Sequence, residues 1–490
     1  MIFFLVLFYF FNFLLTNSVD FNFSKKKQID NEIGSLNKNK LAFGHSIFPF
    51  THSAYLDTTK LSLVKNNPNI YLRPILSLRH SSSGFEIFKR YSSSSVLWIT
   101  PGLEMNFVKP IAFGFFDLGI NLQGWLKFHK HSAYGFNDEV PDLNQVMFQF
   151  HPDHSFEFYS NSKQPSNGID FDEGEGALSL NSRSTNIIFG KFKTNIGPFH
   201  SGNLSISYSA PAFPQVQLRT KNEKINFSFI VGELQSNMSL NSNDSEIIRK
   251  RFIVNHRIDF MIRENFKVGF YEQVFTGDNL SLSYLIPIIP YWSVQHANGD
   301  KDNLQMGFDL EFISNKNKYT FALIVDEWAP FDTFRRNHHN WFGGQIGFSR
   351  LISKKGIFMF EYTRLQPQVY IHDIAINQAF NGNYPIGFWS NGDSEELYFK
   401  FAYFFYDNFN LNVSLRNTNL GNPQYGLNVD FLGGDIKNRT ALEIEMIKKI
   451  YTKIGPLNYL FKINHIKTTN IYEDGNFNDY QISLLYNINY

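Results

Sequence analysis

The chain ends in Tyr480-Gln481-Ile482-Ser483-Leu484-Leu485-Tyr486-Asn487-Ile488-Asn489-Tyr490, a stretch with an apolar or aromatic residue at every even position. Every odd position except Leu485 is polar. Alternation with a period of two places the two sets on opposite faces of a β-strand. A tilted strand needs about 9–11 residues to cross a bilayer. The stretch therefore predicts a membrane-spanning strand with one lipid-facing and one polar face.

The same alternation recurs upstream along most of the chain. It predicts strands near 70–80, 95–108, 113–129, 185–194, 215–219, 225–231, 250–262, 264–275, 308–312, 318–327, 343–353, 356–366, 399–405, 411–415, 442–446 and 459–463. Short polar links such as Lys354-Lys355-Gly356 and Asp407-Asn408 join some of them and resemble hairpin turns. Long stretches rich in Asn, Asp, Pro and Gly separate others, at 132–183, 196–214, 291–303, 329–342 and 367–396. Short turns alternating with long loops are typical of an outer-membrane barrel, with the short turns in the periplasm and the long loops outside.

The predicted fold is all-β: a transmembrane antiparallel β-barrel over residues 66–490. The length of a strand and its link gives an even count of about 14 to 18 strands, with 18 as the best estimate. Aromatic residues cluster at strand ends, as in Tyr403-Phe404-Phe405-Tyr406, which favours girdles at the membrane interfaces over a soluble sandwich. Charged residues on the strands are predicted to face a wet lumen, because a sandwich core cannot accommodate them; they are Arg257, Asp259, Glu361, Arg364, Glu443 and Glu445. The sequence shows no repeat of fixed period, and this counts against a propeller.

Composition excludes several classes of protein and site. The 490 residues include 54 Phe, 24 Tyr and 6 Trp, but only 18% are charged, and the net charge is +1. This balance gives no electrostatic basis for binding nucleic acid. The absence of cysteine excludes disulfides, thiol nucleophiles and cysteine-ligated metals. After the first 20 residues no apolar run reaches the length of about 18 that a helical span requires.

The N-terminus predicts export to the outer membrane of a Gram-negative bacterium. Residues 1–18 read as a signal peptide, because the apolar run of residues 1–15 is followed by the small residues Thr16 and Ser18. No basic residue precedes the run, so an uncleaved anchor is the alternative. Residues 19–65 are polar and charge-rich and predict a periplasmic lead-in or a plug. The partners expected from this location are outer-membrane lipid and the barrel-insertion machinery.

A series of motifs resembles a known family. It comprises Ile187–Phe192, Gly197-Pro198, Gly202-Asn203-Leu204, Ser209-Ala210-Pro211-Ala212-Phe213-Pro214, Asp300–Gly307, Asp326-Glu327-Trp328, Asn340-Trp341-Phe342-Gly343-Gly344-Gln345, Glu361-Tyr362-Thr363-Arg364, Pro385-Ile386-Gly387 and Asn391-Gly392-Asp393. In order and as a set, these motifs resemble the Wzi-like capsule-assembly family of outer-membrane β-barrels, which includes related surface barrels of gliding bacteria. The resemblance covers residues 187–405; within it, Ser209-Ala210-Pro211 lacks the family's two Asn residues before the proline.

The resemblance implies a protein that binds surface polysaccharide and anchors or assembles capsule or exopolysaccharide. A porin or small-solute channel, or a gliding or adhesion protein, are the alternatives. We expect no enzymatic activity and no cofactor, since no nucleophile motif such as G-x-S-x-G is present. No metal site is expected either: the His151/His154 and His338/His339 pairs and the acidic stretch Asp170–Gly176 are interpreted as solvated loops.

Tryptophan residues supply the candidate binding site. Trp292, Trp328, Trp341 and Trp389 lie beside long loops, with acids or amides close by. Rings stack on the C–H faces of sugars, while acids and amides bind hydroxyl groups, so this pairing suits a polysaccharide surface. The candidate contact residues are Asp326, Glu327, Trp328, Trp341, Trp389, Asn391 and Asp393. The alternative is that the rings are interface anchors or pack within loops.

Overall fold

The structure is a computed structural model. It describes residues 18–20, 25–43, 47–48, 50–52, 69–81, 96–113, 116–131, 169–182, 184–235, 250–329, 340–382, 384–406, 408–422, 430–452, 455–470, 475–486 and 488–489. Most of the predicted signal peptide, both histidine pairs and Asp407 lie outside the described residues. The signal peptide therefore stays a prediction. Among the described residues, no helix is long and apolar enough to cross a membrane.

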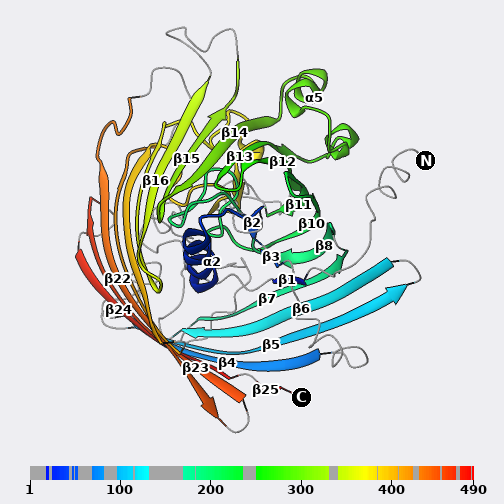
Figure 1. Ribbon diagram of the computed structural model, residues 1–490. Helices are drawn as coiled ribbons and strands as arrows, with labels where there is room; N and C mark the ends of the chain where they lie inside the picture. Colours follow the sequence, from blue (N-terminus) through cyan, green and yellow to red (C-terminus); the bar gives the residue numbers. More distant parts are fainter. Residues whose placement is uncertain are drawn as a thin grey trace.

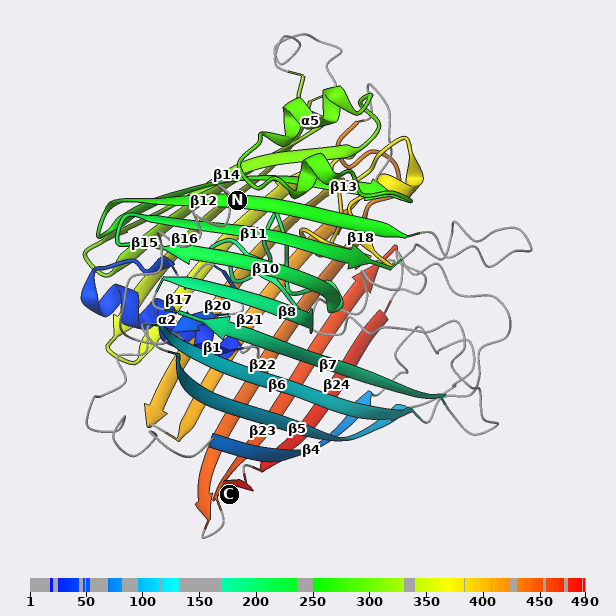
Figure 2. The ribbon, with the colours of Figure 1, turned by 90° about the vertical axis from the view of Figure 1, so that its right-hand side faces the viewer.

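The strands form one closed antiparallel barrel (Figures 1 and 2). Its members are β4 (Asn69–Ser81), β5 (Val96–Phe113), β6 (Phe116–His131), β7 (Ile169–Asn181), β8 (Thr185–Phe192), β10 (Phe213–Lys221), β11 (Ile225–Leu234), β12 (Arg251–Arg263), β13 (Phe266–Gly277), β14 (Asn303–Ser314), β15 (Asn317–Asp326), β16 (Trp341–Ser353), β17 (Gly356–Leu365), β20 (Ser394–Tyr406), β21 (Phe409–Leu420), β22 (Lys437–Thr452), β23 (Gly455–Thr469), β24 (Gly475–Tyr486) and β25 (Ile488–Asn489). The last two pair in succession with β4, so the described residues make a barrel of 18 strands. The predicted fold class and the favoured strand count are confirmed.

Shorter elements lie within the connections and the N-terminal segment. They are β1 (Ser18–Asp20), α2 (Lys25–Lys38), β2 (Ile47–Phe48), β3 (Phe50–His52), β9 (Asn195–Ile196), the 3-10 helix η5 (Leu282–Leu285), α5 (Tyr291–Ala297), the 3-10 helix η7 (Ala375–Asn377), β18 (Phe380–Asn381) and β19 (Tyr384–Pro385). β1 pairs with β3, and β2 pairs with β9. The β2–β9 pairing ties the N-terminal segment to the connection between β8 and β10.

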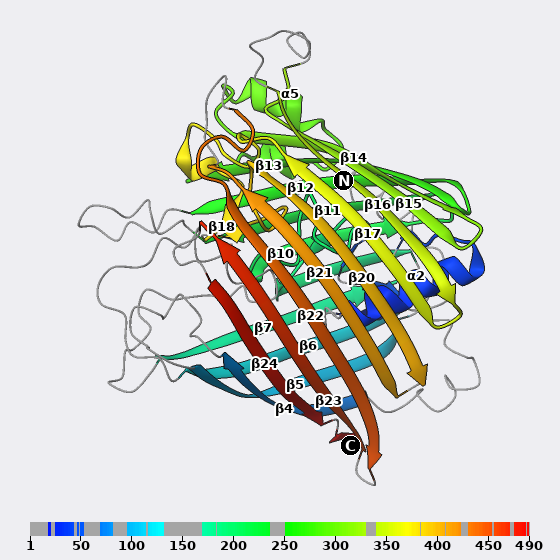
Figure 3. The same cartoon turned by 90° about the vertical axis from the view of Figure 1, so that its left-hand side faces the viewer.

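The C-terminal stretch closes the barrel. β24 runs antiparallel to β4 with Asp479 opposite Ser81, and the two strands lie side by side in Figure 3. The even set faces lipid: Tyr480 is 40% exposed and Ile482 is 48% exposed. Ser483, of the odd set, is buried, and its hydroxyl lies 2.7 Å from that of Ser77 on β4. The alternation in the sequence is thus the division between lipid and lumen.

Charged residues of the strands face the lumen, with one correction. Arg257 of β12 is fully enclosed, and its guanidinium is paired with Asp259 and Asp309. Glu361 of β17 is buried on the same inner face. Arg364, predicted to share that face, lies on the outer one, because it is an odd number of residues from Glu361. Its guanidinium lies 3.9 Å from the ring centre of Phe431, in the connection that follows β21.

One strand of the barrel wall, β7, was not predicted. The acidic stretch Asp170–Gly176, interpreted as a solvated loop, belongs to β7 and pairs with β6. Leu178 and Leu180, in the last part of β7, are lipid-facing and 37% and 38% exposed. The first part of the strand carries acids and glycine where apolar residues would mark a strand, so the alternation is lost there. This part is a strand because it pairs with the long strand β6, and its local sequence pattern does not predict it.

The two ends of the barrel differ. Short hairpins join β12 to β13, β14 to β15 and β16 to β17 at one end, and the long connections gather at the other. α2 lies inside the ring of strands (Figure 1), at the short-turn end (Figure 3). Its residues Ile29, Ile33 and Leu36 share one face and pack against lumen-facing residues that include Ile313 and Ile357. The amide N–H of Leu41, just after the helix, donates to the carbonyl of Glu264 in the β12–β13 turn at 2.7 Å.

Candidate functional site

The connection between β8 and β10, residues 193–212, runs inside the barrel; we call it the inner loop. Its backbone is held by side chains of the wall. The carboxylate of Glu361 accepts the amide N–H groups of His200 at 2.8 Å and Ser201 at 2.7 Å. Gln345 Nε2 donates to the carbonyl of Gly202 at 3.0 Å. These wall residues come from motifs that the sequence singled out, and their role is to fix the inner loop.

The connection between β17 and β20, residues 366–393, lies against the inner loop; we call it the cap loop. The hydroxyl of Tyr370 donates to the carbonyl of Leu204 at 2.8 Å, and the amide N–H of Ser207 donates to the carbonyl of Ile386 at 2.7 Å. Arg251 of β12 donates to the carbonyls of Ile376 and Phe380 in the cap loop. The two loops therefore form one layered unit held to the wall.

Apolar residues make this unit a dry core. Phe199 and Ile206 of the inner loop and Phe388 of the cap loop are completely buried. They belong to one cluster with lumen-facing residues of the wall, among them Ile253, Phe275, Ile324, Trp341 and Leu365. A lumen that conducted solutes would need polar, hydrated walls at this level. The part of the lumen next to β12–β17 is packed like a protein core instead.

α2 is linked to the same unit from the short-turn end. Gln28 Nε2 donates to the carbonyl of Phe199 in the inner loop at 3.2 Å. Glu32 binds Lys318 of β15 at 2.6 Å, and Lys318 also binds Glu311 of β14 at 2.9 Å. All three charged side chains are at least nine-tenths buried. The helix is thus tied to the wall by a buried ion cluster.

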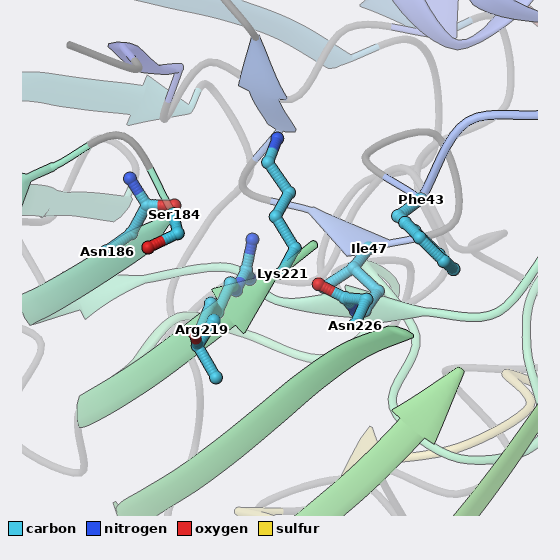
Figure 4. Close-up of a pocket in the computed structure, with 8 residues that line it drawn as sticks. Phe43, Ile47, Ser184, Asn186, Arg219, Lys221 and Asn226 are labelled. Atoms are coloured by element: carbon cyan, nitrogen blue, oxygen red, sulfur yellow. The ribbon is translucent and has the colours of Figure 1, made fainter. Parts of the chain in front are cut away.

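A small cavity lies where the N-terminal segment meets β8, β10 and β11 (Figure 4). Phe43 and Ile47 of the N-terminal segment line one side, and Asn186, Arg219 and Asn226 of β8, β10 and β11 line the other. Its volume of about 10 Å³ has room for about one water molecule. It is too small for a sugar ring.

Four of the seven candidate residues are buried and hold loops. Asp326 is fully enclosed and accepts the amide N–H of Tyr370 at 2.7 Å. Asp393 accepts the amide N–H groups of Asn422 and Leu432, both at 2.7 Å, and so fixes the next connection along the wall. Burial raises the pKa of the Asp393 carboxyl, against these two hydrogen bonds, which lower it.

The other two buried candidates are tryptophans. Trp341 is 5% exposed and belongs to the apolar core of the lumen. Trp389 is 2% exposed, its indole N–H donates to Glu396 at 2.7 Å, and the guanidinium groups of Arg416 and Arg439 lie 5.5 and 5.7 Å from its ring centre. Neither ring has a free face of useful size for a sugar.

The remaining candidates reach the surface at the long-loop end. Trp328 is 37% exposed, and its ring centre lies 5.8 Å from that of Trp292 in α5. Glu327, in the left-handed region at φ 58°, lies 3.0 Å from His372 of the cap loop. Asn391 is partly exposed, in a turn of the cap loop away from this contact. We call Trp292, Glu327, Trp328 and His372 the rim cluster.

His372 is a member of this cluster that the sequence did not indicate. Burial lowers its pKa, but the hydrogen bond and charge of Glu327, with the charges of Asp373 and Asp326, outweigh burial and raise the pKa overall. Nothing local in the sequence connects residues 327 and 372, since their contact depends on how the cap loop folds. Among the described residues, no group of three acidic or histidine side chains could hold a metal ion.

Comparisons with known proteins agree with this architecture. The profile of the family described as capsule assembly protein Wzi matches residues 133–479. Wzi of Escherichia coli, described as an outer-membrane protein involved in group 1 capsule assembly and as a carbohydrate-binding β-barrel, is similar in structure with a TM-score of 0.57 and 12% identity, over 95% of this chain and 99% of that one. OccK7 (OpdD) of Pseudomonas aeruginosa has a TM-score of 0.50 and 9% identity, over 86% of this chain and 99% of that one. The outer-membrane protein OpdK of the same organism has a TM-score of 0.50 and 11% identity, over the same shares of 86% and 99%. A sequence search of curated proteins finds no match.

Proposed function

Because the chain belongs to the Wzi family of capsule assembly proteins and is a barrel of the Gram-negative outer membrane, we propose that it binds surface polysaccharide with its long-loop end and anchors capsule or exopolysaccharide to the cell. The proposal is binding without catalysis. The description of the E. coli relative as a carbohydrate-binding barrel supports it.

The rim cluster carries the proposal. Trp328 keeps more than a third of its surface exposed and has a second ring, Trp292, beside it. An exposed ring offers a flat apolar face to the C–H groups of a sugar, and the neighbouring Glu327 carboxylate accepts hydrogen bonds from hydroxyl groups. In this proposal Glu327, Trp328 and Asn391 contact polysaccharide. Asp326, Trp341, Trp389 and Asp393 hold the loops that present them.

The N-terminal segment has a supporting role. We propose that residues 19–65 act as a plug, with α2 closing the short-turn end of the barrel in the periplasm. The buried ion cluster of Glu32, Lys318 and Glu311 supports a fixed position for the helix, because removing one partner of a buried pair is strongly destabilising. A lumen that is packed beside β12–β17 by loops from one end and by α2 from the other is suited to holding a ligand outside, not to passing solutes.

The channel alternative is tested in planar bilayers. The purified barrel is expected to give no steady open-pore conductance, since the inner loop, the cap loop and α2 fill the lumen beside β12–β17. Steady conductance from the intact protein would favour the porin alternative and count against a purely binding role.

The binding role is tested in cells. Deletion of the gene is expected to shift polysaccharide from the cell-attached to the shed fraction, and the wild-type gene is expected to restore attachment. Complementation with Trp328→Ala should restore the barrel in the membrane but not the attachment. Phe270→Ala is the control, because Phe270 is an aromatic residue on the lipid-facing wall, 47% exposed and away from the rim cluster. Unchanged polysaccharide with lost surface adhesion in the deletion strain would instead favour the adhesion alternative.

A further inference from the structure

The connection between β13 and β14, residues 278–302, folds over the outside of the barrel wall. In β12, β13 and β14 the odd residues face the lumen, where Gln273 Nε2 donates to Gln305 at 2.7 Å. The even residues Val254, Val274 and Leu304 therefore face outward, yet they are at most 1% exposed. They are covered by Tyr284 of η5 and by Tyr291 and Val294 of α5, which join them in one apolar cluster. Figure 1 shows α5 outside the ring of strands.

This connection reaches a histidine–glutamate pair on the outer wall. His256 of β12 and Glu272 of β13 lie opposite each other in the strand register, and His256 Nε2 is 2.8 Å from the Glu272 carboxylate. His256 Nδ1 donates to the carbonyl of Pro287 at 3.0 Å, and the amide N–H of Tyr291 donates to Glu272 at 2.7 Å. The Tyr291 ring stacks on the His256 ring with centres 4.1 Å apart. The connection thus covers the pair and satisfies its hydrogen bonds.

The depth of the His256–Glu272 pair in the membrane can be worked out from its distance to a row of aromatic residues near the short-turn end. Phe266, Phe312, Tyr319 and Phe348 form an outward-facing row with successive ring centres 6.3, 6.4 and 5.5 Å apart. Such a row marks a membrane interface. Glu272 lies six residues beyond Phe266 on β13, which is a rise of roughly 15 Å for a strand tilted by about 40°. Since the apolar band is about 25 Å tall, the pair lies within the band, in its outer half.

The outer surface of the connection is apolar. Residues 279–295 contain no charged side chain. Leu282 is 78% exposed, Ile288 is 82% exposed, and Leu285 and Ile286 are exposed by 37% and 43%. Asp278 precedes this stretch, and Asp300-Lys301-Asp302 follow it. The charges lie where the chain leaves and rejoins the barrel rim, and the aliphatic residues lie between them.

The backbone of the stretch is adapted to a site poor in water. Pro287 and Pro290 have no amide N–H to satisfy. The amide N–H groups of Tyr284, Ile286 and Ile289 donate to carbonyls within the stretch, at 3.1 to 3.3 Å. Backbone polar groups in lipid must be satisfied within the protein, because no water is present there to bind them.

We propose that residues 279–291, which end before Trp292 of the rim cluster, are a lipid-contacting flap that inserts Leu282, Leu285, Ile286 and Ile288 into the outer leaflet. The flap shields the His256–Glu272 pair from the acyl chains and anchors the barrel against vertical movement, much as an interfacial helix does. Its occupant is outer-leaflet lipid, because its exposed face continues the lipid-facing wall, carries no charge and lies at the depth of the apolar band.

Site-directed labelling tests the flap directly, because the chain contains no cysteine. Leu282→Cys and Ile288→Cys are labelled with an environment-sensitive fluorophore, and each barrel is placed in phosphatidylcholine bilayer discs. Both side chains are more than three-quarters exposed, so the substitutions disturb no packing. Phe270→Cys is the lipid-facing control and Glu264→Cys, with its side chain 72% exposed beside a short turn, is the aqueous control.

The expected result is a blue-shifted emission at 282 and 288 that doxyl-labelled lipids quench, as they do at Phe270, with protection from aqueous iodide. Iodide quenching at 282 and 288 equal to that at Glu264 would overturn the proposal. Protection from both iodide and doxyl lipid would also overturn it, since a protein partner or a second copy would then cover the flap. Neither outcome depends on polysaccharide binding, so the flap and the proposed function are tested separately.

Discussion

Replacing Trp328 and Trp389 one at a time by alanine separates a binding ring from a structural ring. The two residues have the same side chain, and each follows a wall strand or precedes one by a few residues. They differ in environment: Trp328 is 37% exposed, and Trp389 is 2% exposed with its N–H bound to Glu396. The same substitution is therefore expected to have different consequences at the two positions.

Burial and hydrogen bonding set the expected magnitudes. A buried aromatic side chain covers about 150–250 Å², which at about 25 cal/mol per Å² amounts to roughly 4–6 kcal/mol. Trp→Ala changes in cores cost about 3–5 kcal/mol, and we expect Trp389→Ala to destabilise the barrel by this amount. Trp328→Ala leaves a site that water can fill, and we expect a loss of about 1–2 kcal/mol. If Trp328 is a main sugar contact, the loss of about 2 kcal/mol of binding free energy lowers the affinity for polysaccharide about thirtyfold.

Two readouts distinguish these effects. The temperature at which the folded band disappears on a heat-modifiability gel measures stability, and sedimentation of labelled polysaccharide with the reconstituted barrel measures affinity. We expect Trp389→Ala to lower the transition temperature more than Trp328→Ala, while folded Trp389→Ala keeps its affinity. A Trp328→Ala barrel that binds polysaccharide like the wild type would refute the reasoning, and Trp328 would then be a loop-packing residue.

Three further predictions concern assembly, the plug and pH. Deletion of residues 477–490 is expected to give no heat-modifiable band, because it leaves unpaired N–H and C=O groups facing lipid at several kcal/mol each; normal insertion would show that β24 is dispensable. Glu32→Gln is expected to speed tryptic cleavage within α2 in the folded barrel, since it weakens the ion cluster with Lys318; unchanged protection would mean that apolar packing alone holds the helix. The raised pKa of His372 means that its contact with Glu327 contributes fully below the unfolded pKa of about 6.5 and is lost as pH rises through the higher folded value. Hydrogen exchange of the cap loop, after correction for the intrinsic base-catalysed rate at each pH, should therefore accelerate over that rise in wild type. A His372→Gln barrel that shows the same corrected acceleration would exclude His372 as its source.

The wall of the barrel was largely readable from the sequence. In β24, the even-numbered positions such as Tyr480 and Ile482 could be assigned to the lipid-facing side from the sequence alone, because side chains alternate across any strand. The same alternation also shows, from the sequence alone, that one of the candidate sugar-binding residues faces the lumen. Phe342, Ile346 and Phe348 mark the outer face of β16, so Trp341, at the other parity, had to face the lumen.

The interior was much less readable. Trp389 and Trp328 look alike in sequence, because each has acidic residues close by and lies in or beside a long connection. Trp389 is buried because the cap loop folds into the lumen and meets Glu396 and Arg416 of the wall. The residues in such contacts come together only in the closed barrel.

The sequence by itself determined most of the wall strands, their lipid-facing set and the two unlike ends, because these follow from local periodicity and link length. Only the tertiary structure decided which way each long connection folds. The cap loop and the flap are both rich in apolar residues, yet Arg251 binds the cap loop within the lumen and His256, five residues along the same strand, binds the flap on the outside. Hydrophobic burial has no direction of its own. The direction comes from the surface that each connection meets, and that surface exists only in the closed barrel.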